Sequence, residues 1–166
     1  MTFILSIFDP LLPFFKWCDD TWLGNLIRGS RLYFPIIETF HLFALTLLFG
    51  AVVILNLRLF GFVLRHQPVS ELAQNLAPWV FWNLVVILSS GTMLFLSEAM
   101  KCFASGPFRF KMIFLFSAIV FHFTIFRWVT RADEDRIRPI GKWVTGVVSL
   151  ALWFGVGLGG RAIGFL

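Results

Sequence analysis

The chain has 166 residues, of which 58% are hydrophobic and 14% are charged, and its formal net charge is +5. Soluble domains average about 45–50% apolar and about 25% charged residues, so this composition excludes an ordinary soluble domain and indicates a membrane protein. The basic residues lie at the ends of apolar segments and form no continuous stripe, which argues against a nucleic-acid-binding protein.

The first 31 residues or so are predicted to lie at the membrane surface. The opening stretch is apolar but lacks a basic start and a small-residue cleavage site, and Pro10 and Pro13 interrupt it. We therefore expect it to be retained and not removed as a signal peptide. The segment WCDDTWLGNLIRGS is predicted to form a short amphipathic helix, which rests on the bilayer through Trp17, Trp22, Leu23 and Leu26.

Four later segments are long enough to cross a membrane, because a spanning helix needs about 20 apolar residues. Pro35, Pro78 and Pro107 are each suited to the first turn of a helix. The predicted crossings cover about residues 34–63, 78–101, 107–130 and 143–166. The predicted fold is thus all-α, an integral membrane four-helix bundle with a short N-terminal interfacial helix, forming a single transmembrane domain over residues 1–166.

Three polar segments are predicted to connect the crossings: RHQPVSELAQNLAP, CFASGP and TRADEDRIRPIGK. Four crossings place both chain ends on one side of the bundle, which we call the terminal face. The 14 Lys and Arg residues divide evenly between the two sides and so do not orient the protein. The basic cluster in TRADEDRIRPIGK favours the cytoplasm for that loop, and hence periplasmic termini in a bacterial inner membrane.

Each predicted crossing carries one charged residue about one turn from the terminal face, counted at about 1.5 Å per residue. An isolated charge in hydrocarbon costs about 2.5–3.5 kcal/mol or more, and pairing removes much of that cost. We therefore predict a buried interhelical network of Glu38, Glu98, Lys111 and Arg161. The alternative is that both cations extend to the headgroups and both acids face water.

The histidines are candidate haem ligands. Glu38 and His41 share one helical face, one turn apart, inside an apolar stretch. His41 and His122 differ in predicted depth by roughly nine residues, about 13 Å, which is too far for both to bind one iron. His41 is therefore expected to pair with Met112, the closest match in depth, or with its twin in a second subunit. Without a cofactor, His41 would hydrogen-bond Glu38 or another neighbour, and His122 would bond Asn83 or Asn56.

Sulfur-containing residues near the His41 end of the bundle suggest copper as an alternative cofactor. Thioethers together with imidazole, and with Cys102 as a further candidate, suit Cu(I). The candidate metal ligands are His41, Met93, Met100 and Met112. Methionines also fill gaps between helices without binding metal, and Cys18 and Cys102 fit no zinc or redox spacing.

The last crossing contains pairs of small residues four apart, Gly155 with Gly159 and Gly160 with Gly164. Such pairs let two helix backbones approach closely. They are expected to pack either inside the bundle or in a homo-oligomer.

Several stretches resemble an uncharacterised family of small bacterial multi-pass membrane proteins, over nearly the whole chain. These are WCDDTWLGNLIRGSRLYFPIIETFHLFALTLLFG, NLRLFG, SSGTMLFLSEA, FRFKM and SLALWFGVGLGGR. The acid and histidine at Glu38 and His41 are the most distinctive part, whereas the acidic residue usual before LRL is Asn56 here. The family has no settled activity to transfer. A looser similarity in size and helix pattern to the membrane domain of copper resistance protein D keeps copper as a candidate.

The sequence contains no Ser-His-Asp arrangement, no phosphate-binding glycine loop and no cysteine with an obvious base, which argues against an enzyme acting alone. The first hypothesis is a small membrane cytochrome that binds haem b through His41 and passes electrons, within a homo-oligomer or a larger membrane complex. The second is a copper-handling membrane protein. The third is a cofactor-free accessory or structural subunit.

Overall fold

The computed structural model describes residues 9–132 and 138–163, which form helices joined by short turns, with no strand in these ranges. Four helical stretches are long and apolar enough to cross a membrane: α4 (Tyr33–Leu59), α5 (Val69–Ser97), the stretch Gly106–Arg131 and α9 (Pro139–Ile163). The protein is therefore an all-α, multi-pass membrane protein, as its composition predicts.

The N-terminal segment contains two helices where the sequence predicted one. After the short 3-10 turn η1 (Asp9–Leu11) come α2 (Leu12–Asp19) and α3 (Trp22–Gly29). The side chain of Thr21 accepts a hydrogen bond from the Gly24 N–H at 3.2 Å, so Thr21 is the N-cap that starts the second helix. Trp17 and Trp22 are exposed, which suits contact with a bilayer surface. Residues 1–8 lie outside the described ranges.

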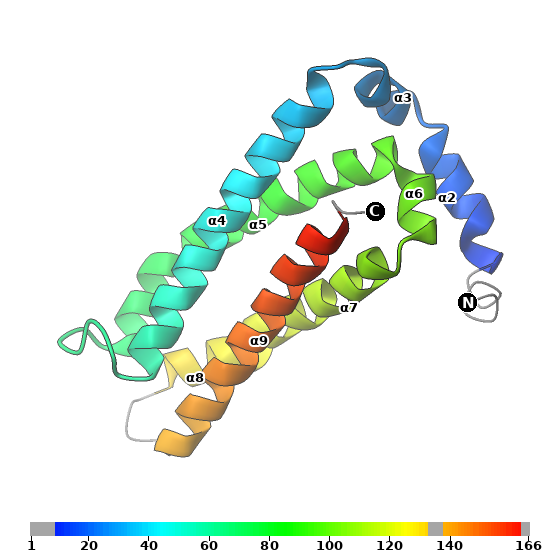
Figure 1. The fold of residues 1–166 in the computed structure, drawn as a ribbon. Coiled ribbons are helices and arrows are strands. Elements are labelled where there is room, and N and C mark those ends of the chain that lie inside the picture. The colour runs from blue at the N-terminus through cyan, green and yellow to red at the C-terminus, as the bar shows by residue number, and fades with distance from the viewer. Residues whose placement is uncertain (1–8, 133–137, 164–166) are drawn as a thin grey trace.

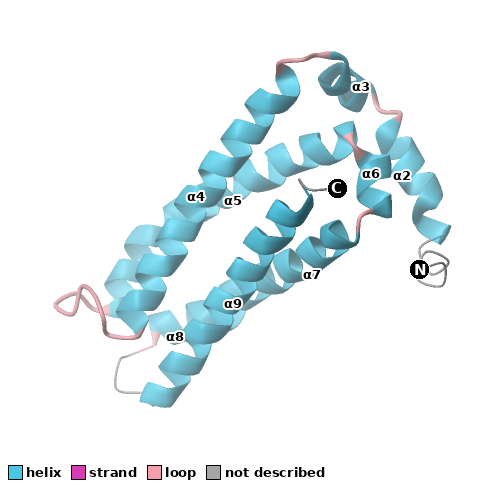
Figure 2. Ribbon diagram, in the orientation of Figure 1, coloured by secondary structure: helices cyan, strands magenta, loops and turns pink. Residues whose placement is uncertain are grey.

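The four crossings form two antiparallel hairpins (Figures 1 and 2). Along most of their length α4 packs against α5, and α7 (Gly106–Phe121) packs against α9. Contacts between α4 and α9 join the two hairpins. The helices α2 and α3 lie at the end of the bundle where α4 begins and where α5 and α9 end. This end is the terminal face.

The second crossing differs most from its predicted bounds. It begins at Val69, nine residues before the predicted start, so Pro78 lies inside α5. Proline removes only one backbone donor, and membrane helices tolerate it because neighbouring groups compensate. The segment RHQPVSELAQNLAP is therefore largely helical. At the terminal face α5 stops at Ser97, and α6 (Ala99–Ala104) continues in a new direction, leaving Ser105 between α6 and α7.

The third crossing changes its helical type near its far end. Here α7 passes into a π-helical segment, η2 (His122–Phe126), and then into α8 (Arg127–Arg131). π-Helical turns inside α-helices occur often at functional sites. The fourth crossing, α9, begins four residues before the predicted Trp143, and residues 164–166 at its predicted end lie outside the described ranges.

The apolar core has two parts. One joins all four crossings and includes Leu48, Val52, Leu84, Ala118 and Trp153. The other lies at the end away from the terminal face, where Leu55, Leu59, Leu72, Phe126 and Val129 meet. Large apolar side chains on α5 and α7 remain exposed, which supports direct contact with lipid.

Candidate functional site

His41 is the buried titratable residue of the terminal half of α4, with only 7% of its surface exposed. Its Nδ1 lies 2.9 Å from the Ser90 hydroxyl on α5. That hydroxyl donates its own hydrogen to the Val86 carbonyl, so its oxygen accepts from the imidazole. We therefore assign the ring proton to Nδ1, which leaves a lone pair on Nε2.

The backbone of α5 makes room for this imidazole. A methyl group on Gly91 would lie 3.2 Å from His41 Cε1, so the glycine lets the ring sit directly against the helix. Glu38, one turn earlier on α4, is exposed and is not the partner of the ring. The sequence located the histidine but not its serine partner.

Lys111 lies on α7 against the glycine-rich end of α9. A methyl group on Gly159 would lie 3.0 Å from Lys111 Cβ, and one on Gly160 would lie 3.7 Å from its Nζ. The ammonium is near enough to interact electrostatically with His41 on α4 and with Cys102 on α6.

The four predicted charged residues do not form the predicted buried network. Glu98 pairs with Lys101 three residues along the chain, because the break after Ser97 makes Glu98 the N-cap residue of the short helix α6, on which Lys101 lies. Glu38 and Arg161 are exposed. Lys111 is partly buried and lies between α7 and α9.

His122 lies in the π-helical segment, away from the terminal face. Its ring stacks on Phe126, with centroids 5.2 Å apart, and meets Trp153 of α9 edge to face at 6.4 Å. Its buried Nδ1 has no hydrogen-bond partner in the described part of the chain. The expected bonds to Asn56 or Asn83 are therefore wrong: the Asn56 amide donates to Val52 and Ser149, and that of Asn83 donates to Trp79.

The sulfur-containing candidates are distributed over three helices. Met93, on α5, and Met100, on α6, are both exposed. Met112 lines a cavity of about 210 Å³ between the N-terminal helices and α7, together with Cys102, Arg109, Leu11 and Phe15. No group of three or more His, Cys, Asp or Glu side chains that could hold a metal occurs within residues 9–132 and 138–163.

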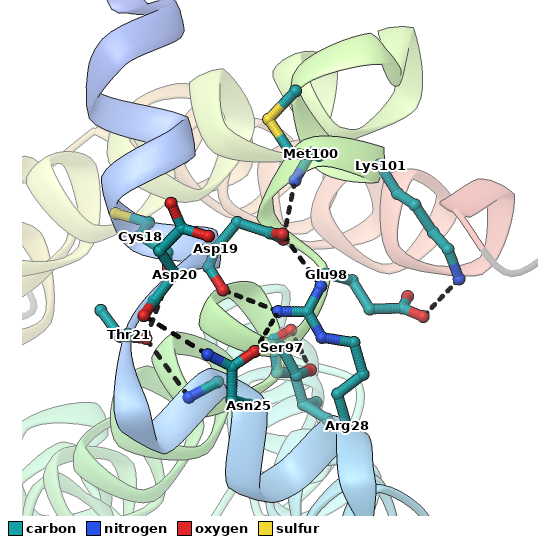
Figure 3. A network of polar contacts seen from close by, with 12 residues as sticks. Cys18, Asp19, Asp20, Thr21, Asn25, Arg28, Ser97, Glu98, Met100 and Lys101 are labelled. Carbon is teal, nitrogen blue, oxygen red and sulfur yellow. Dashed lines mark hydrogen bonds and ion pairs between the residues drawn. The ribbon is translucent and has the colours of Figure 1, made fainter.

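A polar network that the sequence analysis missed holds α2 and α3 against the break between α5 and α6 (Figure 3). Asp19 Oδ2 accepts from Arg28 at 2.9 Å, and Asp19 Oδ1 accepts from the Met100 N–H at 3.4 Å, near the start of α6. Arg28 also donates to Asn25 at 3.1 Å. Asp19 thus supplies, from a distant segment, a cap for a helix that has none of its own.

The electrostatic environment of this network agrees with its geometry. The Arg28 hydrogen bond holds the pKa of Asp19 below its ordinary value, and the Met100 N–H acts in the same direction. Burial raises the pKa of the neighbouring Cys18 thiol. Gly24 permits the close fit, because a methyl group there would overlap the Leu96 carbonyl of α5. Thr21 is a residue type that often caps helices, and it is the sequence signal from which this helix break could have been found.

Comparison with known proteins identifies the family but no activity. A family model described as a family of unknown function, DUF6644, matches residues 14–166. The chain belongs to this family. Neither the curated proteins nor the solved structures gave a match. Membership of DUF6644 agrees with the resemblance drawn from the sequence, whereas the looser similarity to copper resistance protein D is not shown.

Proposed function

We propose that the protein is a small b-type cytochrome of the bacterial inner membrane, which binds haem b through His41 and passes electrons to a membrane partner. The observation that supports this most is the hydrogen bond from His41 Nδ1 to Ser90. Histidines that bind metals usually donate their other ring N–H to a fixed acceptor, which sets the tautomer and the ring orientation. His41 has this arrangement, with Nε2 carrying the lone pair.

The residues around His41 fit those of a histidine that would hold haem. Ser90 fixes the ring by hydrogen bonding, and Gly91 holds it against α5. Ala44 and Ile87, one turn away on α4 and α5, are buried, so the region next to the ring is apolar. Bound haem would supply one-electron redox chemistry, and a dry, apolar surrounding is one of the features that tune its potential.

Met112 and His122, the other candidate haem ligands, are placed elsewhere, so we propose that each chain supplies one ligand. Met112 lines the cavity beside the N-terminal helices, and His122 packs between Phe126 and Trp153. We therefore propose that His41 of one chain and His41 of a second copy in a homo-oligomer would hold the haem together, with the terminal face on the periplasmic side.

The test is an absorption spectrum of detergent-purified protein from cells supplied with haem. We expect a Soret band that is lost in His41→Ala and kept in the matched control His122→Ala. Ser90→Ala should weaken haem affinity about 10–100-fold, because it removes the acceptor that orients the ring. A colourless, folded wild-type protein, or a band that survives in His41→Ala, would refute the proposal.

Copper handling is the second candidate, and one observation favours it. Cys102 and Met112 line the same cavity, and thiolate and thioether are soft ligands that suit Cu(I). Metal analysis of the same preparations separates the two functions. Copper bound in proportion to protein and lost in Met112→Leu would favour this candidate over haem.

A further inference from the structure

Lys111 carries a positive charge that a bound anion would stabilise. Its stem packs on Gly159, its ammonium lies beside Gly160 near the C-terminal end of α9, and the residue is half-buried. Within the described part of the chain, no carboxylate lies within ion-pair distance of this ammonium. The titratable groups near enough to interact with it are His41 and Cys102, and neither is an acid that balances a positive charge at neutral pH.

Three of the described acids of the terminal face are engaged or turned elsewhere. Asp19 binds Arg28 and the start of α6, and Glu98 binds Lys101. Glu38 is exposed on α4. Among the described residues, Lys111 is therefore left as a cation without a carboxylate partner, in a partly apolar setting. A charge at membrane depth is costly unless it is paired or reaches the interface.

We infer that Lys111 forms a binding site for the phosphate of an anionic phospholipid at the terminal face. Lys111 is the sixth residue of α7, only about 8 Å from the start of that helix, which is the level expected for lipid headgroups. Arg109 and Arg161 lie near the same ends of α7 and α9. Basic pockets between membrane helices are known sites for acidic headgroups.

The glycines of α9 are part of this site. Without side chains at Gly159 and Gly160, α7 and α9 come close enough for the lysine stem to lie on the glycine backbone. The stem is held against α9, while the residue as a whole keeps part of its surface accessible. An anchored cation of this kind distinguishes a headgroup site from a lysine that extends freely into water.

The experiment compares thermal unfolding in detergent micelles doped with phosphatidylglycerol, with phosphatidylcholine, or with inorganic phosphate alone. We expect phosphatidylglycerol to raise the Tm of the wild type by about 2–4 °C more than phosphatidylcholine. The increment should vanish in Lys111→Met and persist in Lys111→Arg. It should also persist in Lys101→Met, a matched control that removes an exposed, paired lysine from the same face.

Three results would contradict the inference or its assignment to lipid. An equal increment in Lys111→Met would overturn it, and the same increment from inorganic phosphate alone would overturn the assignment to lipid. If Lys111→Met does not fold, native mass spectrometry of the wild type decides: preferential retention of phosphatidylglycerol supports the site, and equal retention of both lipids overturns it. The increment should persist in His41→Ala, so a failure of haem binding and a failure of this site are distinguishable.

Discussion

At the scale of single residues, Cys102 shows how the terminal face changes the chemistry of a side chain. Burial raises the pKa of its thiol to about 11, and the negative charge of Glu98 adds to this effect. The positive charges of Lys111 and Lys101 oppose it but do not outweigh it. The thiol is thus held in its neutral, unreactive form, although Cys102 is only partly buried.

Alkylation of Cys102 is expected to be slow and to depend strongly on pH. At pH 8 a thiol with this pKa is about 0.1% ionised, against about a quarter for a free cysteine, so the folded chain should react on the order of 10²-fold more slowly than the denatured chain. The rate should rise about tenfold per pH unit up to about pH 11. Maleimide labelling of a Cys18→Ala variant measures it.

Glu98→Gln in the Cys18→Ala variant tests whether the charge of Glu98 raises the pKa of Cys102. Because the Glu98 charge raises the pKa, its removal should lower the pKa and speed the reaction at pH 8. Labelling of the folded protein at the rate of the denatured chain would contradict the assigned environment.

At the scale of elements, the glycines of α9 decide how closely the fourth crossing packs on the third. A methyl group on Gly155 would overlap the ring of Phe114 on α7, and one on Gly159 would meet Lys111. Gly157, on the same helix, has open space around it. The predicted pair of Gly155 and Gly159 therefore packs inside the bundle, against α7. Gly164, from the second predicted pair, lies outside the described ranges.

Alanine substitutions at Gly155 and Gly157 should have different effects on the free energy of unfolding. Gly155→Ala should lower the free energy of unfolding by about 1–3 kcal/mol, because Phe114 must move and already packs on Phe110. Gly157→Ala, the matched control, should be neutral or raise it by about 0.5–1 kcal/mol, because alanine favours a helix over glycine. Thermal unfolding in detergent measures both, and equal effects would show that α9 does not pack on α7 as described.

At the scale of the whole molecule, a buried polar contact ties the two hairpins together. Asn56 of α4 is fully buried, and its amide donates to the Ser149 hydroxyl of α9 at 3.2 Å. The same amide donates to Val52 on its own helix. Between apolar helices, a hydrogen bond of this kind fixes rotation and register as well as adding stability.

Loss of this contact should loosen the two hairpins. Ser149→Ala is expected to lower the free energy of unfolding by about 0.5–1.5 kcal/mol, since the Asn56 donor loses an acceptor. Ser89→Ala is the matched control: Ser89 is exposed and donates only to carbonyls of its own helix, so its loss should change little. Unfolding by denaturant in mixed micelles compares the two, and an equal response would argue against the contact.

Parts of the fold and of the site could be predicted because they depend on local properties. Apolar composition located the crossings, with the third predicted over 107–130 and found over Gly106–Arg131. The spacing of Glu38 and His41 singled out the histidine that is buried. The start of α5 was missed because Pro78 reads as a boundary, although a membrane helix tolerates proline in its interior.

By itself the sequence determined that the protein crosses a membrane with helices and carries His41 near one end of the bundle. These features depend on hydrophobicity and spacing, which are properties of residues close together in the chain. Only the tertiary structure decided that His41 meets Ser90, that Lys111 lies on Gly159, and that Glu98 turns to Lys101. Those pairings depend on how each helix is rotated and tilted against the others. Each further residue along a helix turns the side-chain direction by about 100°, so an error of one or two residues in a helix boundary is enough to exchange one partner for another.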